Sequence, residues 1–332
     1  MTEGTQSGSL AVAPLPKKRN FVSDFIARLF KEKPLGAVGG VIFLIMLLTG
    51  IFADLLAPYG FNETNPLYML EPPSAEFWLG TDSLGRDVLS RIIYGARISM
   101  IVGFCATSFS ILISVIIGIT CGFFGGKYDM IMQRLVDAWM VFPGLIILLV
   151  AISITGPGLW EIIFVLGLVY GIAGSRIIRG ATLSTRENTY VYASNAIGGS
   201  SLRQLLRHVL PNIMAPIIIL FTTRLAAVIL SEAVLSFLGL GIPPPMPSWG
   251  GMLHSARGYM LHAPYLALWP GIALSIAVYG INVFGDALRD LLDPRLRGGI
   301  GTYAGISEAA KKKKDKSKEK EEGVLDEDQN ES

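Results

Sequence analysis

Six apolar stretches, each about as long as a helix that crosses a bilayer, constrain this chain more than any other feature. They lie at about 35–57, 98–121, 138–155, 159–178, 212–236 and 265–287. A spanning helix needs roughly 20 mostly apolar residues, and its backbone groups must bond to one another. Only 16% of the residues are charged, whereas soluble domains carry about 25%. The sequence therefore predicts an all-α polytopic membrane protein with six transmembrane helices.

The distribution of basic residues predicts the orientation of these spans. If both termini lie in the cytoplasm, 23 of the 28 lysines and arginines fall on the cytoplasmic side. Only Arg86, Arg91, Arg97 and Arg257 fall outside, and Arg224 lies within a span. Short cytoplasmic loops are enriched in lysine and arginine. Both termini are therefore expected in the cytoplasm.

The spans and the segments around them divide the chain into five parts. These are a cytoplasmic N-terminal segment (1–34), the first span (35–57), an extracytoplasmic segment (58–97), a membrane domain of five helices (98–288) and a charged cytoplasmic tail (289–332). The membrane domain contains a cytoplasmic loop at 186–211 and an outer loop at 237–264. The tail is too polar to form a core, so we expect it to be disordered.

An amphipathic helix is expected just before the first span. Residues 21–31 carry an apolar face made of Phe21, Phe25, Ile26, Leu29 and Phe30. This pattern is typical of a helix lying in the membrane interface. Packing of the same face against the bundle is an equal alternative.

Two further features are predicted on the outer side. An apolar stripe in residues 80–99 predicts a short surface helix leading into the second span, with Asp87 and Arg91 at the i, i+4 spacing of an ion pair. Four prolines within 243–247 exclude a helix there. Trp249, which follows them, suits a membrane interface.

Small residues at four-residue spacing occur in two spans. Gly118 and Gly122 form one such pair, and Gly167 and Gly171 form another. Small residues allow helix backbones to approach closely. We interpret both pairs as packing within one bundle, and a dimer face is the alternative.

The cytoplasmic loop at 186–211 contains two predicted short helices about a Gly198-Gly199 joint. The first runs from Tyr190 to Ile197 and is expected to turn Tyr192, Ser194 and Asn195 outward. The second begins at a capping box formed by Ser201 and Gln204. Its apolar stripe is expected to pack beneath the bundle, and it consists of Leu202, Leu205, Leu206, Val209 and Leu210. Pro211 then opens the next span, where a missing N–H is tolerated.

Such a hinged element joined to two spans can carry a push from a cytoplasmic partner into the membrane. The chain carries no recognisable source of energy or catalytic motif of its own. The stretch GFFGGKY at 122–128 fails as a phosphate-binding loop because Cys121 and Tyr128 replace required residues. No HExxH or GxSxG motif occurs. We therefore expect neither an enzyme nor a bound cofactor or metal.

Two charged residues lie within the fifth span. Arg224 and Glu232 are separated by about 12 Å along a helix. Because a charge at the bilayer centre costs about 3 kcal/mol or more, each is expected to face the bundle or a water-filled path. Either they line a translocation pathway, or they form ion pairs with another subunit.

Four stretches give the chain a resemblance to a known family. Ala193, Gly198 and the later His208-x-Leu210-Pro211 resemble the cytoplasmic EAA loop of ABC importer permease subunits. GTDSLGRDVLSRIIYGARIS at 80–99, GGKYDMIMQRLVDAWMVFPGLIILL at 125–149 and EAVLSFLGLGIPPPMPSWG at 232–250 are similar to signatures of the second permease subunit of peptide/nickel-type importers. In the loop, Tyr192 stands where the family has a glutamate, so an ion pair or cap made by that glutamate cannot form here.

The resemblance implies a type I ABC importer permease fold with a cytoplasmic coupling helix. The implied partners are a second homologous permease subunit, two ABC ATPases, an extracytoplasmic substrate-binding protein and membrane lipid, with no nucleic acid. The implied location is the cytoplasmic (inner) membrane of a bacterium or archaeon. The coupling residues would be Tyr190, Tyr192, Ala193, Ser194, Asn195, Ile197, Gly198 and Gly199, supported by Leu202, Leu205, Leu206 and Pro211.

Two other functional classes compete with this interpretation. A secondary transporter driven by an ion gradient predicts matching halves with interrupted spans and midplane carboxylates. An intramembrane hydrolase needs a nucleophile and a base, and no such set is legible. An associated ATPase would separate the importer from both. The solute stays open among dipeptides, oligopeptides, nickel chelates and other small molecules.

Overall fold

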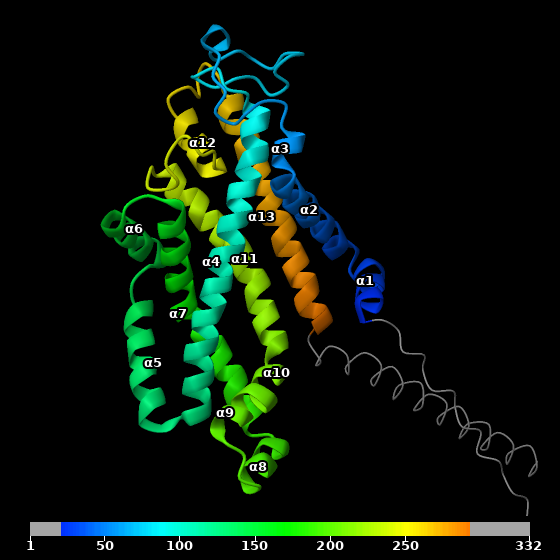
Figure 1. Cartoon of the computed structure of the whole chain (residues 1–332), viewed down its shortest axis with the longest axis vertical. Coiled ribbons are helices and arrows are strands. Elements are labelled where there is room, and N and C mark those ends of the chain that lie inside the picture. Colours follow the sequence, from blue (N-terminus) through cyan, green and yellow to red (C-terminus); the bar gives the residue numbers. More distant parts are fainter. Residues whose placement is uncertain (1–20, 293–332) are drawn as a thin grey trace, which may run out of the picture.

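The computed structural model describes residues 21–292, which fold into one elongated helical bundle (Figure 1). The predictions for residues 1–20 and for the tail from 293 onward lie outside the described residues. The elements are α1 (Phe21–Glu32), α2 (Pro34–Ile51), α3 (Ala53–Leu56), η1 (Pro66–Tyr68), α4 (Val88–Phe124), α5 (Gly126–Met140), α6 (Gly144–Thr155), α7 (Leu159–Arg186), α8 (Thr189–Ala196), α9 (Ser201–Gln204), η2 (Leu205–Val209), α10 (Leu210–Asn212), α11 (Met214–Phe237), α12 (Trp249–Ala256) and α13 (Tyr265–Leu292).

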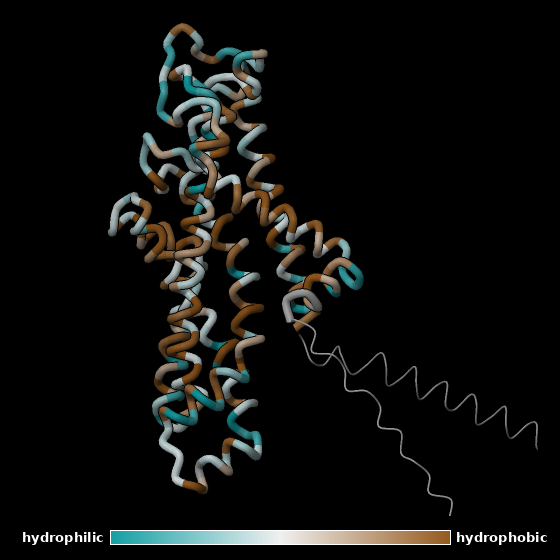
Figure 2. Tube along the Cα trace, turned by 45° about the vertical axis from the view of Figure 1, so that its right-hand side comes forward, coloured by the Kyte–Doolittle hydropathy of each residue, from teal (hydrophilic) through white to brown (hydrophobic). Residues whose placement is uncertain are grey.

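Within residues 21–292, five helices are long and apolar enough to cross a membrane, namely α2, α4, α7, α11 and α13. Apolar residues predominate through the middle of the bundle, and polar residues gather toward its two ends (Figure 2). This is the distribution that a bilayer requires, because its core offers no water to polar groups. The first, second, fourth, fifth and sixth predicted spans are therefore confirmed as long apolar helices.

The third predicted span, 138–155, is wrong as a single straight helix. The chain forms α5 and α6 instead, and their axes meet at 87° across a short break. Pro143 lies in this break. A proline has no N–H to donate and its ring clashes with the carbonyl four residues earlier, so the helix ends before it. At 12 residues, α6 is about 18 Å long, too short to cross the bilayer alone.

The second span and the surface helix expected before it are one continuous helix, α4. It contains 37 residues and is thus about 55 Å long, so it reaches from the outer segment to the opposite end of the bundle (Figure 1). Asp87 begins it by accepting a hydrogen bond from the Ser90 N–H at 2.7 Å. The predicted Asp87–Arg91 ion pair is wrong, because this carboxylate caps the helix.

Helices α4 and α7 pack closely through their small residues. A Cβ atom added at Gly118 would lie 2.7 Å from both the Ile178 Cβ and the Ser175 carbonyl oxygen. Gly171 approaches Ile113 in the same way, and the Ser114 hydroxyl donates to the Gly171 carbonyl at 2.8 Å. Because the neighbours belong to this chain, packing within one bundle is confirmed for both glycine pairs.

The N-terminal helix α1 is divided between the two expected roles. Leu29 is buried against Ala287 and Leu291 of α13. Ile26 and Phe30 leave about half of their surface exposed, 48% and 58%. One edge of α1 therefore packs on the bundle, and the rest of its apolar face is free to contact lipid.

Candidate functional site

The predicted coupling segment forms α8, which lies at the tip of the bundle below α7 and α9 (Figure 1). Gly198 follows this helix with φ +80°, a conformation that side chains other than glycine rarely adopt. The Gly199 N–H donates to the Ser194 carbonyl at 2.9 Å. This bond is part of the Schellman arrangement that ends many helices. The Gly-Gly joint inferred from the sequence is therefore a sharp, hydrogen-bonded turn.

The solvent-facing side of α8 and the residue after it carry aromatic and apolar side chains at the point where the chain projects furthest. Tyr192 is 61% exposed and Ile197 is 87% exposed, while Tyr190 and Ala193 are also on the surface. Val191 and Ser194 are buried. The prediction that Ser194 faces outward is wrong, because it lies on the inner side against the Gly199 turn. The side chain of Asn195 is outside the described part of the chain.

The second half of the loop differs from the single capped helix that we predicted. Ser200 occupies the cap position of α9, and its side chain makes no capping bond. The Gln204 side chain donates to the Gly199 carbonyl at 2.9 Å. Gln204 therefore ties α9 to the turn at Gly198 and Gly199. Within the described residues, the capping-box hydrogen bonds predicted between Ser201 and Gln204 do not form.

Helix α9 passes into one π-helical turn, η2, before α10. Pro211 explains this widening, because its ring would clash with the Arg207 carbonyl in a regular helix. Leu205, Val209 and Leu210 pack on the cluster containing Ile119 and Ile178. Leu202 and Leu206 are instead 65% and 58% exposed, so the support predicted from these two leucines is wrong within this chain.

The charges of the fifth span have separate surroundings. The guanidinium carbon of Arg224 lies 5.2 Å from the centre of the Tyr170 ring, and the Tyr170 hydroxyl is 2.7 Å from the Ser231 hydroxyl. Glu232 is completely buried and accepts a hydrogen bond from Ser236 at 2.7 Å. The structure thus places Glu232 inside this chain's own packing, where it reaches the start of the outer loop.

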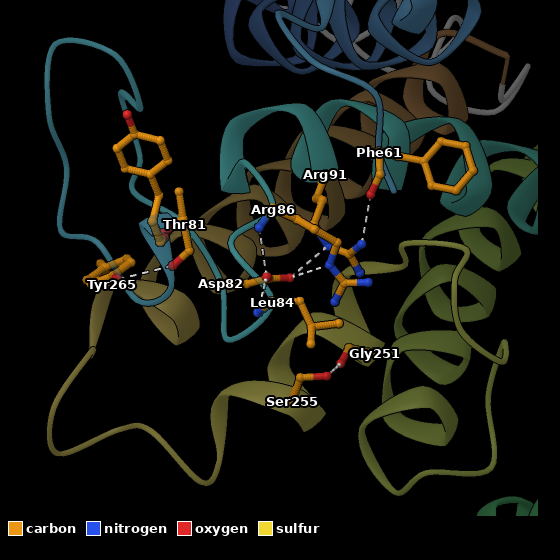
Figure 3. Close-up of polar contacts among 10 residues, drawn as sticks. Phe61, Thr81, Asp82, Leu84, Arg86, Arg91, Gly251, Ser255 and Tyr265 are labelled. Carbon is orange, nitrogen blue, oxygen red and sulfur yellow. Dashed lines mark hydrogen bonds and ion pairs between the residues drawn. The ribbon is translucent and has the colours of Figure 1, made fainter. Parts of the chain in front are cut away.

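The end of the bundle opposite α8 holds a cluster around Asp82 (Figure 3). Its carboxylate accepts hydrogen bonds from the backbone N–H groups of Leu84 and Arg86 at 2.8 and 3.0 Å, and from Arg86 Nε at 2.7 Å. Arg91 Nε lies 3.6 Å from the same carboxylate. Arg91 also donates to the Phe61 carbonyl at 2.9 Å. One acidic side chain therefore organises the turn that leads into α4.

The outer loop folds over this cluster. Residues 238–248 are non-helical as the prolines require, and α12 follows them. Trp249 is fully buried and donates from its indole nitrogen to the Ile92 carbonyl at 3.1 Å. The interfacial position predicted for Trp249 is therefore wrong, since the loop packs inward on α4 instead of facing lipid.

These features define a class of protein. A bundle of apolar spans that carries a hinged, partly apolar helix at one end and a folded loop region at the other is a multi-pass membrane protein. Residues 114–298 match the family described as binding-protein-dependent transport system inner membrane component. Residues 21–73 match the N-terminal transmembrane domain of oligopeptide transport permease C.

Relatives and a solved structure agree with these matches. A dipeptide transport system permease from Alkalihalophilus pseudofirmus is 39% identical over 80% of this chain and 88% of its own. An oligopeptide transport system permease from Bacillus subtilis is 38% identical over 81% and 88%. A glutathione transport system permease from Pectobacterium atrosepticum is 37% identical over 81% and 90%. A chain of the MetNI methionine ABC transporter in an inward-facing conformation superposes with a TM-score of 0.51 at 18% identity, covering 61% of this chain and 96% of that one.

The chain therefore belongs to the family of ABC importer permease subunits. The type I permease fold expected from the resemblance is confirmed, and the family assignment favours an importer permease over a secondary transporter. Members of this family are permease subunits and not enzymes by themselves, and they act with other transporter components.

Proposed function

We propose that this chain forms half of the membrane pathway of an importer whose energy comes from two separate cytoplasmic ATPases. A second homologous permease would supply the other half, and an extracytoplasmic binding protein would deliver the solute. The relatives named for dipeptide, oligopeptide and glutathione transport support peptides or similar small solutes as the cargo. In this proposal the chain itself catalyses no reaction.

The observation that carries this proposal is α8 with its hinge at Gly198. A helix that lays exposed apolar and aromatic side chains into a groove of its partner is a common mode of protein recognition. Tyr192 and Ile197 are exposed at the tip, while the turn and Gln204 hold the helix in a defined position. A rigid element of this kind can transmit a displacement to α7 and α11, which it joins.

The orientation follows from the same proposal. With α8 in the cytoplasm, the segment around Asp82 and the loop at 237–264 lie outside a cytoplasmic (inner) membrane. The excess of lysine and arginine on the α8 side supports this placement. Both termini are then cytoplasmic.

We expect the Tyr192→Ala variant to bind the ATPase subunits more weakly. An exposed aromatic anchor at an interface is worth about 2 kcal/mol, which is roughly a thirtyfold loss of affinity. Glu187→Ala, an exposed position in the same loop, is the matched control and should keep normal affinity. Co-purification of the ATPases from membranes measures both. Equal retention by the two variants would exclude α8 as the docking element, and solute transport by the purified chain alone in vesicles would refute the importer.

We also propose that Arg224 lies on the pathway. Among the described residues its guanidinium lies over the Tyr170 ring and makes no ion pair, and a half-buried cation without a carboxylate partner marks a functional position in a span. In this proposal the guanidinium of Arg224 donates hydrogen bonds to the passing peptide. Replacing Arg224 with glutamine removes that charge and should slow peptide uptake by about tenfold or more. Arg257, which stacks on Phe237 in the outer loop, provides the control Arg257→Gln. Unchanged transport and substrate preference in Arg224→Gln would remove the pathway role.

A further inference from the structure

Two nearly buried arginines share a single carboxylate at the outer end of the bundle (Figure 3). The side chains of Arg86 and Arg91 are 11% and 10% exposed, and both pair with Asp82. These three groups carry a net charge of +1. The nearby Asp87 carboxylate is occupied by the Ser90 N–H and hydroxyl, each at 2.7 Å. Within the described residues Asp82 is the carboxylate that pairs with both arginines, and because buried charges are costly unless paired, a second anion would stabilise them.

The two arginines also have N–H groups that donate to no protein atom in the described residues. Arg86 uses its Nε for Asp82, and Arg91 uses one terminal nitrogen for the Phe61 carbonyl. Within residues 21–292, the two terminal nitrogens of Arg86 make no hydrogen bond to the protein. A guanidinium group presents its donors as a planar fork that matches the two oxygens of a carboxylate. The spare donors therefore suit this particular anion.

A cavity of about 250 Å³ gives an anion access to both side chains. Its wall combines Arg86 and Arg91 with the proline-containing loop and with His254. The neighbouring Ser255 hydroxyl donates to the Gly251 carbonyl at 3.1 Å, and in the described part of the chain neither arginine donates to it. The volume fits a terminal group and its first few atoms better than a whole drug-sized solute, since complete ligand pockets measure about 300–1,000 Å³.

We propose that this cavity binds a carboxylate, supplied either by the C-terminus of the transported peptide or by an acidic side chain of the extracytoplasmic partner. The proposal rests on the importer function, which places the cavity on the extracytoplasmic side, where the binding protein would deliver the solute. Asp82 is a built-in competitor for the same arginines. It therefore sets the affinity of the site as well as the shape of the turn.

Because Asp82 and the bound carboxylate compete for the same arginines, substitutions at Arg86 and at Asp82 should change the affinity in opposite directions. Arg86→Gln removes a cation and should weaken carboxylate binding by about tenfold or more, whereas Arg86→Lys keeps the charge and should lose less. Asp82→Asn keeps the oxygen that accepts from the Leu84 and Arg86 N–H groups but removes the competing charge, so it should tighten binding. Arg257→Gln, on the same outer side, is the control and should change nothing. A site that is merely structural would lose affinity in both cluster variants.

The complete importer in lipid nanodiscs, without its binding protein, is titrated with radiolabelled dialanine and with the C-terminal amide of dialanine. The carboxylate belongs to the peptide if dialanine binds more weakly to Arg86→Gln and more tightly to Asp82→Asn. The affinity for the C-terminal amide of dialanine should then be the same in both variants. The same opposite changes in the affinity of the binding protein for the nanodisc complex, with dialanine unaffected, assign it to the partner. If neither ligand shows opposite changes, the proposal is overturned. Solute transport by the purified chain alone in vesicles would refute the importer function, and that separate experiment leaves these binding measurements unchanged.

Discussion

The Gly198→Pro variant is expected to insert and fold but to lose peptide uptake, while its ATPase partners continue to hydrolyse ATP. Gly198 has φ +80°, whereas the proline ring holds φ near −65°. The turn that places Gly199 N–H against the Ser194 carbonyl therefore cannot form. Since Gln204 is bonded to the Gly199 carbonyl, α8 and α9 lose their fixed relative position. Displacement of α8 is then no longer transmitted to the spans.

Gly198→Ala is the graded control for this prediction. No atom lies within 4 Å of a Cβ added at this position, so alanine meets only backbone strain of about 1–2 kcal/mol. We expect partial uptake from it. Proteoliposomes containing the complete importer allow peptide uptake and phosphate release to be measured on the same sample. Uptake at the normal rate by Gly198→Pro contradicts transmission through this hinge.

The second large effect is expected at the contact of α4 with α7. Gly118→Leu should prevent folding, because even a Cβ atom there lies 2.7 Å from Ile178 Cβ and from the Ser175 carbonyl oxygen. Backbone atoms cannot move aside as a flexible side chain can. Gly118→Ala should fold with a cost of about 1–3 kcal/mol, the usual range for overpacking. Thermal unfolding in detergent, followed by size-exclusion chromatography, measures both variants.

Gly180 of α7 is the matched position for this test. It is an exposed residue two positions after Ile178 in the same helix, and no atom lies within 4 Å of its Cβ position. Gly180→Ala should therefore raise the midpoint of thermal unfolding slightly, since alanine favours a helix by about 1 kcal/mol over glycine. Equal effects of alanine at Gly118 and Gly180 would show that close helix contact does not limit stability here.

The spans and the coupling helix could be predicted because their signals are local. An apolar run of about 20 residues has few alternatives to a spanning helix, and glycine after a short helix indicates a turn with positive φ. The same reasoning failed at 138–155, where hydropathy continued through a backbone break. Pro143 was the signal that could have placed the break, because proline interrupts a helix that hydropathy alone extends.

Side-chain partners were predicted less well. Spacing along one helix shows which two groups can form a hydrogen bond or ion pair, but it does not show whether another group lies nearer to one of them. Asp87 and Arg91 had the spacing of an ion pair, yet Asp87 caps α4 and Arg91 turns to Asp82 and Phe61. Ser201 and Gln204 had the spacing of a capping box, yet Gln204 reaches the Gly199 carbonyl. The cavity at Arg86 was missed because most of its wall comes from the outer loop, about 150 residues away along the chain.

Hydrophobic length and charge asymmetry determined from the sequence alone that this chain is a multi-pass helical membrane protein, because the bilayer tolerates almost no other structure for such segments. The Gly198 joint was likewise legible, since only glycine takes that backbone conformation cheaply. Tertiary structure alone decided the 87° bend between α5 and α6, the inward burial of Trp249 and the sharing of Asp82 by two arginines. Pro143 could mark where the helix breaks, but the angle of the bend, the burial of Trp249 against Ile92 and the choice of Asp82 by Arg91 belong to the folded chain, and no single residue spacing records them.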